Sequence, residues 1–228
     1  MTIHPEQLAY WYFRLNGFLT IPNFIVHPDR GSNQETDIDV LGVRFPYRAE
    51  NLIRPMKDDA HFAKIRDKTF IAIAEVKSER CALNGSWTNP ERQNMHRVLR
   101  AIGAFPETES DLVAQSLYDK GHYTSQLYHV SLMCLGRESN TEVTHVPQIL
   151  WTEVLAFIYR RFNEYKKQKV SHQQWDKYGH DLWNAFEKSS DEDHFREIVR
   201  VQSYDENSSV DRTSMQIPIM PVQPRRKI

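Results

Sequence analysis

The sequence has little cysteine and no long apolar run. Its 228 residues contain two cysteines, Cys81 and Cys134, which have neither zinc-finger spacing nor the density of a disulfide-rich secreted protein. We expect both to be reduced thiols, with Cys134 buried. No apolar run approaches the roughly 20 residues that span a bilayer, and the first residues lack the basic and apolar regions of a signal peptide. The sequence therefore predicts a cytoplasmic protein without a membrane segment.

An excess of one charge and several familiar catalytic motifs are also missing. The formal net charge is −1, so any contact with nucleic acid has to come from local basic patches. The ten histidines are dispersed without the spacing of a histidine metal site. The chain has no glycine-rich phosphate loop and no Gly-x-Ser-x-Gly elbow. Zinc–histidine, P-loop and serine-hydrolase chemistry are therefore the weaker candidates.

The composition, 40% hydrophobic and 26% charged, allows the chain to bury a core and favours one domain with appendages. We expect a core over residues 1–140, with an insertion at 46–67, and a helical extension over 145–203 packed on that core. Residues 204–228 have too little apolar content to fold alone and are expected to form a flexible tail.

Apolar periodicity, proline and glycine predict the order of the elements. They are a helix over 5–16, strands over 18–26, 35–45 and 68–78, a helix over 90–102, a strand over 126–135, and helices over 146–169 and 172–188. Pro22 predicts that the first strand lies at an edge or contains a bulge. Asn89 and Ser171 are the expected N-caps of two of the helices. A short helix is expected at 60–66, inside the insertion.

The strand over 68–78 ends in two opposite charges. Its uncharged residues suit a central strand covered on both faces. Because strand side chains alternate between faces, Glu75 and Lys77 project to one side while Val76 packs on the other. An acidic residue at the rim of an apolar strand is rare unless it is paired or bound to a metal. Two interpretations are open at this point: an ion pair that ends the strand, or part of a catalytic site.

The preceding strand carries three carboxylates at alternate positions, Glu35, Asp37 and Asp39, which therefore share a face. If the two strands are neighbours, Asp39 meets Glu75 and Lys77 at one rim of the sheet. Two carboxylates and a backbone carbonyl suit a hard divalent cation such as magnesium, and a lysine beside it can orient water or stabilise an oxyanion.

These motifs, Ile38-Asp39-Val40-Leu41 and the run Ile-Ala-Ile-Ala-Glu-Val-Lys at 71–77, resemble the PD-(D/E)xK nuclease superfamily, which includes restriction endonucleases and Holliday-junction resolvases. The resemblance covers about residues 6–136. It implies an α/β restriction endonuclease-like core, in which a helix, three strands, a helix and a strand form a central mixed sheet flanked by helices. It further implies a divalent-metal-dependent endonuclease that acts on DNA.

The resemblance also implies roles for particular residues. Asp39, Glu75 and the backbone carbonyl of Val76 would bind Mg²⁺ or Mn²⁺, and Lys77 would complete the catalytic set. Two further positions match family residues: Glu6, at the glutamate that resolvase-like members carry in the first helix, and Gln93, at a glutamine in the helix after the lysine. Asp37 and Glu35 are expected to support the site.

The chain departs from the family pattern in two ways. No proline precedes the aspartate, which leaves Asp37 as an alternative to Asp39 as the primary ligand; we prefer Asp39 because apolar residues follow it directly. The long gap between Asp39 and Glu75 is explained by the insertion. Basic residues in and beside the insertion either contact a phosphate backbone or form a solvated surface. These residues are Arg44, Arg48, Arg54 and Lys57.

The function expected from the resemblance is an endonuclease in restriction or defence, acting as a homodimer or in a larger complex. Two alternatives remain open: a nuclease-fold binding module without turnover, and a structural subunit of a nucleic-acid-processing complex. The second is suggested by the helical extension and by Trp151, Trp175 and Trp183, which we expect to be exposed. The sequence leaves open DNA against RNA, strand type and sequence specificity.

Overall fold

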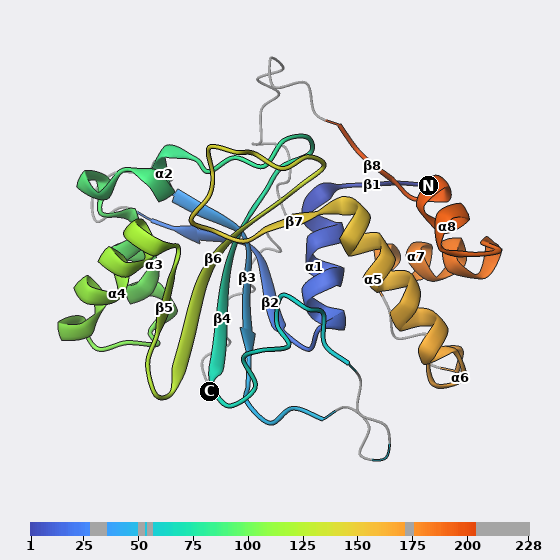
Figure 1. The fold of residues 1–228 in the computed structure, drawn as a ribbon, viewed down its shortest axis with the longest axis horizontal. Coiled ribbons are helices and arrows are strands. Elements are labelled where there is room, and N and C mark those ends of the chain that lie inside the picture. The colour runs from blue at the N-terminus through green and yellow to red at the C-terminus, as the bar shows by residue number, and fades with distance from the viewer. Residues whose placement is uncertain (28–35, 50–52, 54–56, 172–175, 204–228) are drawn as a thin grey trace, which may run out of the picture.

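The computed structural model, which describes residues 1–27, 36–49, 53, 57–171 and 176–203, is an α/β fold with a mixed sheet between two groups of helices (Figure 1). The main strands are β2 Leu19–Val26, β3 Thr36–Arg44, β4 Thr69–Val76, β5 His122–Thr124, β6 Tyr128–Gly136 and β7 Gln148–Leu150. The helices are α1 Pro5–Leu15, α2 Gly85–Thr88, the 3₁₀ helix η1 Pro90–Arg92, α3 Asn94–Ile102, α4 Glu107–Lys120, α5 Trp151–Glu164, α6 Lys166–Lys169, α7 Lys177–Lys188 and α8 Glu192–Ile198.

The strand order is β2-β3-β4-β6-β5, and β7 also pairs with β6. The pairs β2–β3 and β3–β4 are antiparallel, whereas β4 and β6 are parallel and joined by a crossover that contains α2, η1, α3 and α4. Because β4 pairs with β6 along nearly its whole length, β5 and β7 share the other edge of β6. Among the strands of the described residues, β2 pairs only with β3, which confirms that Pro22 lies in an edge strand.

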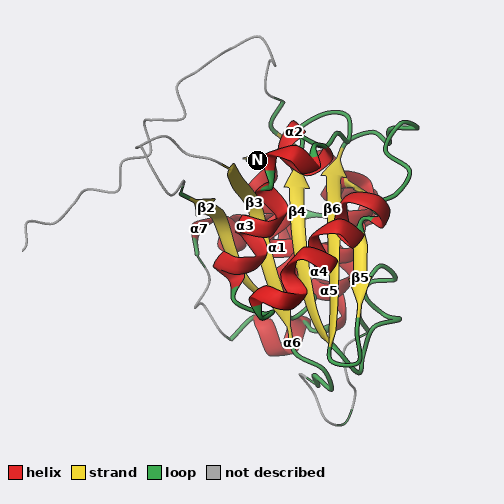
Figure 2. Ribbon diagram, turned by 90° about the vertical axis from the view of Figure 1, so that its left-hand side faces the viewer, coloured by secondary structure: helices red, strands yellow, loops and turns green. Residues whose placement is uncertain are grey.

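Helices cover both faces of the sheet, as Figure 2 shows with α3 and α4 in front and α1 and α5 behind. The alternation of side chains along β4 separates two cores. Phe70, Ala72 and Ala74 pack with α1, α5, α7 and α8, whereas Ile71 and Ile73 pack with α3 and α4. The expectation of a central strand covered on both faces is therefore confirmed.

The helical part after α5 is tied to the beginning of the chain. Two short strands, β1 Thr2–Ile3 and β8 Arg200–Val201, pair in parallel, and the amide of Arg200 donates to the Met1 carbonyl at 2.9 Å. No helix among the described residues is long and apolar enough to cross a membrane.

Several expected helix boundaries are wrong. Gln93 has a left-handed backbone (φ 54°), so the helix expected over 90–102 is split into η1 and α3. Residues 148–150 form β7, which delays the next helix to Trp151. The side chain of Asp176, not Ser171, caps α7 by accepting from the Gly179 amide at 2.8 Å. The expected start of that helix, 172–175, lies outside the described residues.

Some elements were not predicted and one was predicted wrongly. Helix α4 buries only Ser110, Val113, Ala114 and Leu117, too narrow an apolar stripe to stand out in a polar stretch. Helix α8 and strand β8 were also missed. The short helix expected at 60–66 is absent; the Asp59 carbonyl instead accepts the amides of Phe62 and Ala63 in a turn.

The tryptophans expected to be exposed are not. Trp151 and Trp183 are only 3% and 7% exposed and belong to the core that α1 and α5 share, while Trp175 lies outside the described residues. The two cysteines are free thiols and both are buried, as expected for Cys134.

Candidate active site

The acidic start of β3 lies against the charged end of β4. In this antiparallel pair Val40 is the partner of Ala74, so one further step of the register brings Asp39 opposite Glu75. The Asp39 Oδ2 atom accepts the Val76 amide at 2.7 Å. This hydrogen bond joins the end of β4 to β3 and holds the Asp39 carboxylate beside Glu75.

Both oxygens of Glu75 have donors, although the residue is only 2% exposed. Its Oε1 accepts from Lys77 Nζ at 2.7 Å, and its Oε2 accepts from Trp87 Nε1 at 2.6 Å. Lys77 Nζ also donates to Asn84 Oδ1 at 3.0 Å. A buried carboxylate needs such donors, because an unpaired buried charge is strongly destabilising.

The carboxyl group of Asp39 has a raised pKa. Its pKa is raised to about 7, first by burial and then by the neighbouring Glu75 charge; the Val76 amide opposes the increase, and Glu6 and Asp37 add smaller increases. Glu6, near the start of α1, and Asp37 are thus within electrostatic reach of Asp39. A buried group with a perturbed pKa beside a specific charge partner is a candidate functional residue.

The structure brings together most of the residues that the sequence singled out for this rim: Asp39, Glu75 and Lys77, with Asp37 and Glu6 near Asp39. Glu35 lies outside the described residues. Gln93 is exposed at the junction of η1 and α3, where it begins α3 rather than lying in the middle of a helix.

The placement of the basic residues predicted to contact phosphates agrees less well with that prediction. Arg44 is 3% exposed, forms an ion pair with Asp58 at 2.9 Å and donates to the carbonyls of Phe62 and Ile65. Burial lowers its pKa. This arginine ties the insertion to β3, so its placement argues against the expected phosphate contact. Arg48 lies 3.4 Å from the same Asp58.

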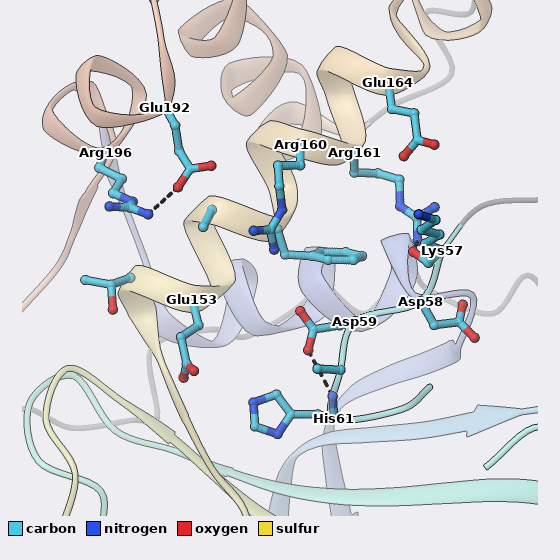
Figure 3. A pocket seen from close by; sticks show the side chains of 14 residues that line it. Lys57, Asp58, Asp59, His61, Glu153, Arg160, Arg161, Glu164, Glu192 and Arg196 are labelled. Atoms are coloured by element: carbon cyan, nitrogen blue, oxygen red, sulfur yellow. Dashed lines mark hydrogen bonds and ion pairs between the residues drawn. The ribbon is translucent and has the colours of Figure 1, made fainter. Parts of the chain in front are cut away.

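Of the other predicted basic residues, Lys57 is exposed and Arg54 lies outside the described residues. Lys57 lines a cavity of about 680 Å³ between α5, α8 and residues 57–61 (Figure 3). The cavity wall carries both signs of charge: Arg196 pairs with Glu192 within it, and Asp59, Glu153 and Arg160 also line it. It lies on the α5 side of the molecule and does not include Asp39, Glu75 or Lys77.

The donor set at the rim suits a hard cation. The described residues contain no ready-made group of three acidic, histidine or cysteine ligands. Mg²⁺, however, is usually held by one or two carboxylates with several waters. Asp39 and Glu75 supply two carboxylates. The N–H and C=O of a strand residue point to the same neighbouring strand, so the Val76 carbonyl faces the Asp39 side.

Sequence reasoning missed Trp87 and Asn84. They come from the segment after Lys77, where the pair Asn84-Gly85 signals a turn back toward the strand. An indole close to a buried Glu-x-Lys pair in sequence is the available signal, because a buried indole N–H needs an acceptor.

No protein-family model matches this chain, no curated protein matches its sequence, and no solved structure matches its fold. What can be stated of its class therefore rests on its own architecture: an α/β protein with a mixed central sheet flanked by helices.

Proposed function

We propose that the protein is a divalent-metal-dependent endonuclease of the PD-(D/E)xK type that hydrolyses phosphodiester bonds in DNA. The observation that carries the proposal is the meeting of Asp39, Glu75 and Lys77 at one rim, with Asp39 bonded to the Val76 amide at 2.7 Å.

The topology supports the same proposal. A helix, three successive antiparallel strands, a helical crossover and a strand parallel to the third follow one another from α1 to β6. That order is the one the resemblance implies for a restriction endonuclease-like core, and it places the acidic start of β3 beside the end of β4. A cytoplasmic location and a role in restriction or defence belong to this proposal.

The proposed roles follow from the contacts. Asp39, Glu75 and the Val76 carbonyl would hold Mg²⁺ or Mn²⁺, which supplies Lewis-acid stabilisation of the phosphate and an activated water. Lys77 donates 2.7 Å from Glu75, so its ammonium is placed to orient the attacking water or to stabilise charge on the phosphate. The partly buried Asp39 binds a proton near neutral pH without metal, and it would release that proton when the metal binds.

The test is cleavage of linear, supercoiled, branched and single-stranded DNA, with an RNA panel, by purified protein in Mg²⁺, Mn²⁺ or EDTA. We expect metal-dependent cleavage by wild type and by Glu107→Gln, whose carboxylate is exposed on α4 and pairs with Arg100. Lys77→Met should abolish it.

Cleavage in EDTA, or undiminished cleavage by Lys77→Met, would overturn the proposal. Nucleic-acid binding without cleavage under every metal condition would favour a binding module. Neither binding nor cleavage would favour a structural subunit.

A further inference from the structure

The segment between β4 and α3 returns to the rim and contacts the side chains of Glu75, in β4, and of Lys77, directly after it. Helix α2 has only four residues, too short for a helix to be stable by its own hydrogen bonds. What holds it is the burial of Trp87, which is 1% exposed in the core beneath α3 and α4. The bond from the Trp87 amide to the Asn84 carbonyl, at 2.9 Å, closes its single turn.

Asn84 is in the N-cap position of α2, but its side chain does not cap the helix. Its Oδ1 accepts from Lys77 Nζ at 3.0 Å instead. An asparagine at this position normally bonds to the first-turn amides, so the local capping interaction is given up for a contact with the lysine.

Trp87 and Glu75 form a buried hydrogen bond that gives each of them a partner. The indole N–H has Glu75 Oε2 as its acceptor at 2.6 Å, and the carboxylate, with Lys77 on its other oxygen, cannot rotate without losing one of two donors. Hydrogen bonds to a charged group are stronger than neutral ones and fix its direction.

We propose that Trp87 and Asn84 are positioning residues with separate tasks: Trp87 orients the Glu75 carboxylate for metal binding, and Asn84 orients the Lys77 ammonium for the chemical step. This inference rests on the proposed nuclease function. Outer partners of metal-binding carboxylates act in this way, and their loss typically reduces metal affinity or activity about 10- to 100-fold.

The experiment compares Trp87→Phe and Asn84→Ala with wild type. Phenylalanine keeps most of the buried ring and removes the N–H. Mn²⁺ binding without DNA is measured from the paramagnetic resonance signal of free Mn²⁺, and cleavage is measured over a Mn²⁺ titration. Trp87→Phe should raise the Mn²⁺ dissociation constant about 10- to 100-fold while kcat at saturating metal falls only a few-fold. Asn84→Ala should leave Mn²⁺ affinity within about twofold and lower kcat about 10-fold or more.

Trp11→Phe is the matched control. Trp11 is also buried, at 2% exposure, and its indole donates to a carboxylate, Asp176 Oδ1, at 3.0 Å, on the far side of the sheet from Trp87. It should change neither the Mn²⁺ affinity nor kcat, and its melting temperature sets the expected loss for deletion of an indole N–H.

Equal effects of Trp87→Phe and Asn84→Ala on affinity and kcat, or a Trp87→Phe variant that matches Trp11→Phe in both, would overturn the positioning roles while leaving the nuclease proposal in place. A wild type that neither binds Mn²⁺ nor cleaves would remove the nuclease proposal and this inference with it. A Trp87→Phe variant that melts far below Trp11→Phe would also count against it, because packing would then be the role of Trp87.

Discussion

Lys77 Nζ lies 2.7 Å from Oε1 of Glu75, the residue two positions before it in the sequence. The contact is compatible with a simple ion pair that ends β4. Its surroundings distinguish it from a simple ion pair. Asp39, with a pKa of about 7, lies beside Glu75, and the segment after Lys77 supplies two further hydrogen-bond partners, Asn84 and Trp87. Buried carboxylates that repel one another destabilise the fold, and a strand end with a purely structural role would not require them.

The choice between the two aspartates of β3 is testable. Asp39 is bonded to β4, whereas Asp37 is opposite Ile25 of β2, beyond the last β3–β4 pair. Asp39→Ala, Glu75→Ala and Lys77→Ala should each abolish cleavage, while Asp37→Ala should keep measurable activity in the same assay. Glu6→Gln should weaken the metal dependence mildly, since Glu6 acts on Asp39 through its charge. Equal losses at Asp37 and Asp39 would overturn the ligand assignment.

Asp39→Asn should raise the melting temperature of the metal-free protein. The substitution removes a charge that Glu75 repels, and the amide oxygen can still accept from Val76. With ~10 mM Mg²⁺ and a dissociation constant of about 1 mM, wild type should gain about 1.4 kcal/mol and narrow the gap, while the variant gains much less. Differential scanning fluorimetry with EDTA and with Mg²⁺ measures this. A variant less stable than wild type in EDTA would show that the carboxylates do not share a site.

The stability of the metal-free protein should depend on pH in a direction that Asp39 sets. Its pKa is raised in the folded state, so the folded protein binds this proton more tightly than the unfolded chain. The contribution is fully present below about pH 4 and is lost as the pH rises through about 7. The free energy of unfolding of Asp39→Asn relative to wild type should thus grow between pH 4 and pH 8, by on the order of 3 kcal/mol. Urea unfolding in EDTA at several pH values measures it; a constant difference would contradict it.

Gly179→Ala should loosen the helical extension. A Cβ at Gly179 in α7 would fall 1.9 Å from Trp11 Cζ2 in α1, and both groups are buried. We expect a loss of about 1–3 kcal/mol despite the better helix propensity of alanine, because overpacking outweighs it. Gly85→Ala is the control, since its Cβ would meet only Arg92 Nη1 at an ordinary 3.5 Å. Chemical unfolding compares the two, and equal stabilities would show that Trp11 moves aside at little cost.

The parts of the fold that the sequence predicted are those with a strong local signal. The run at 69–76 has no charged residue before Glu75 and forms β4, and Pro5 and Gly17 bracket α1. Alternation places Glu75 and Lys77 on one side of their strand, whereas Asp39 was singled out by the resemblance and reaches Glu75 through the pairing of β3 with β4. Helix α4 was missed because its apolar stripe is narrow, whereas β8 and the role of Arg44 depend on contacts distant in sequence. The sequence around Arg44 indicates a surface cation, but residues of the insertion cover it in the structure.

The pair β1–β8 joins the end of the helical extension to the residues that lead into α1. Strand β1 ends two residues before Pro5, where α1 begins, and Glu6 follows at once. The Met1 and Ile3 carbonyls accept the amides of Arg200 and Gln202, both at 2.9 Å. The first turn of α1, and with it Glu6, is thus anchored by hydrogen bonds to a segment of the chain nearly 200 residues away in sequence.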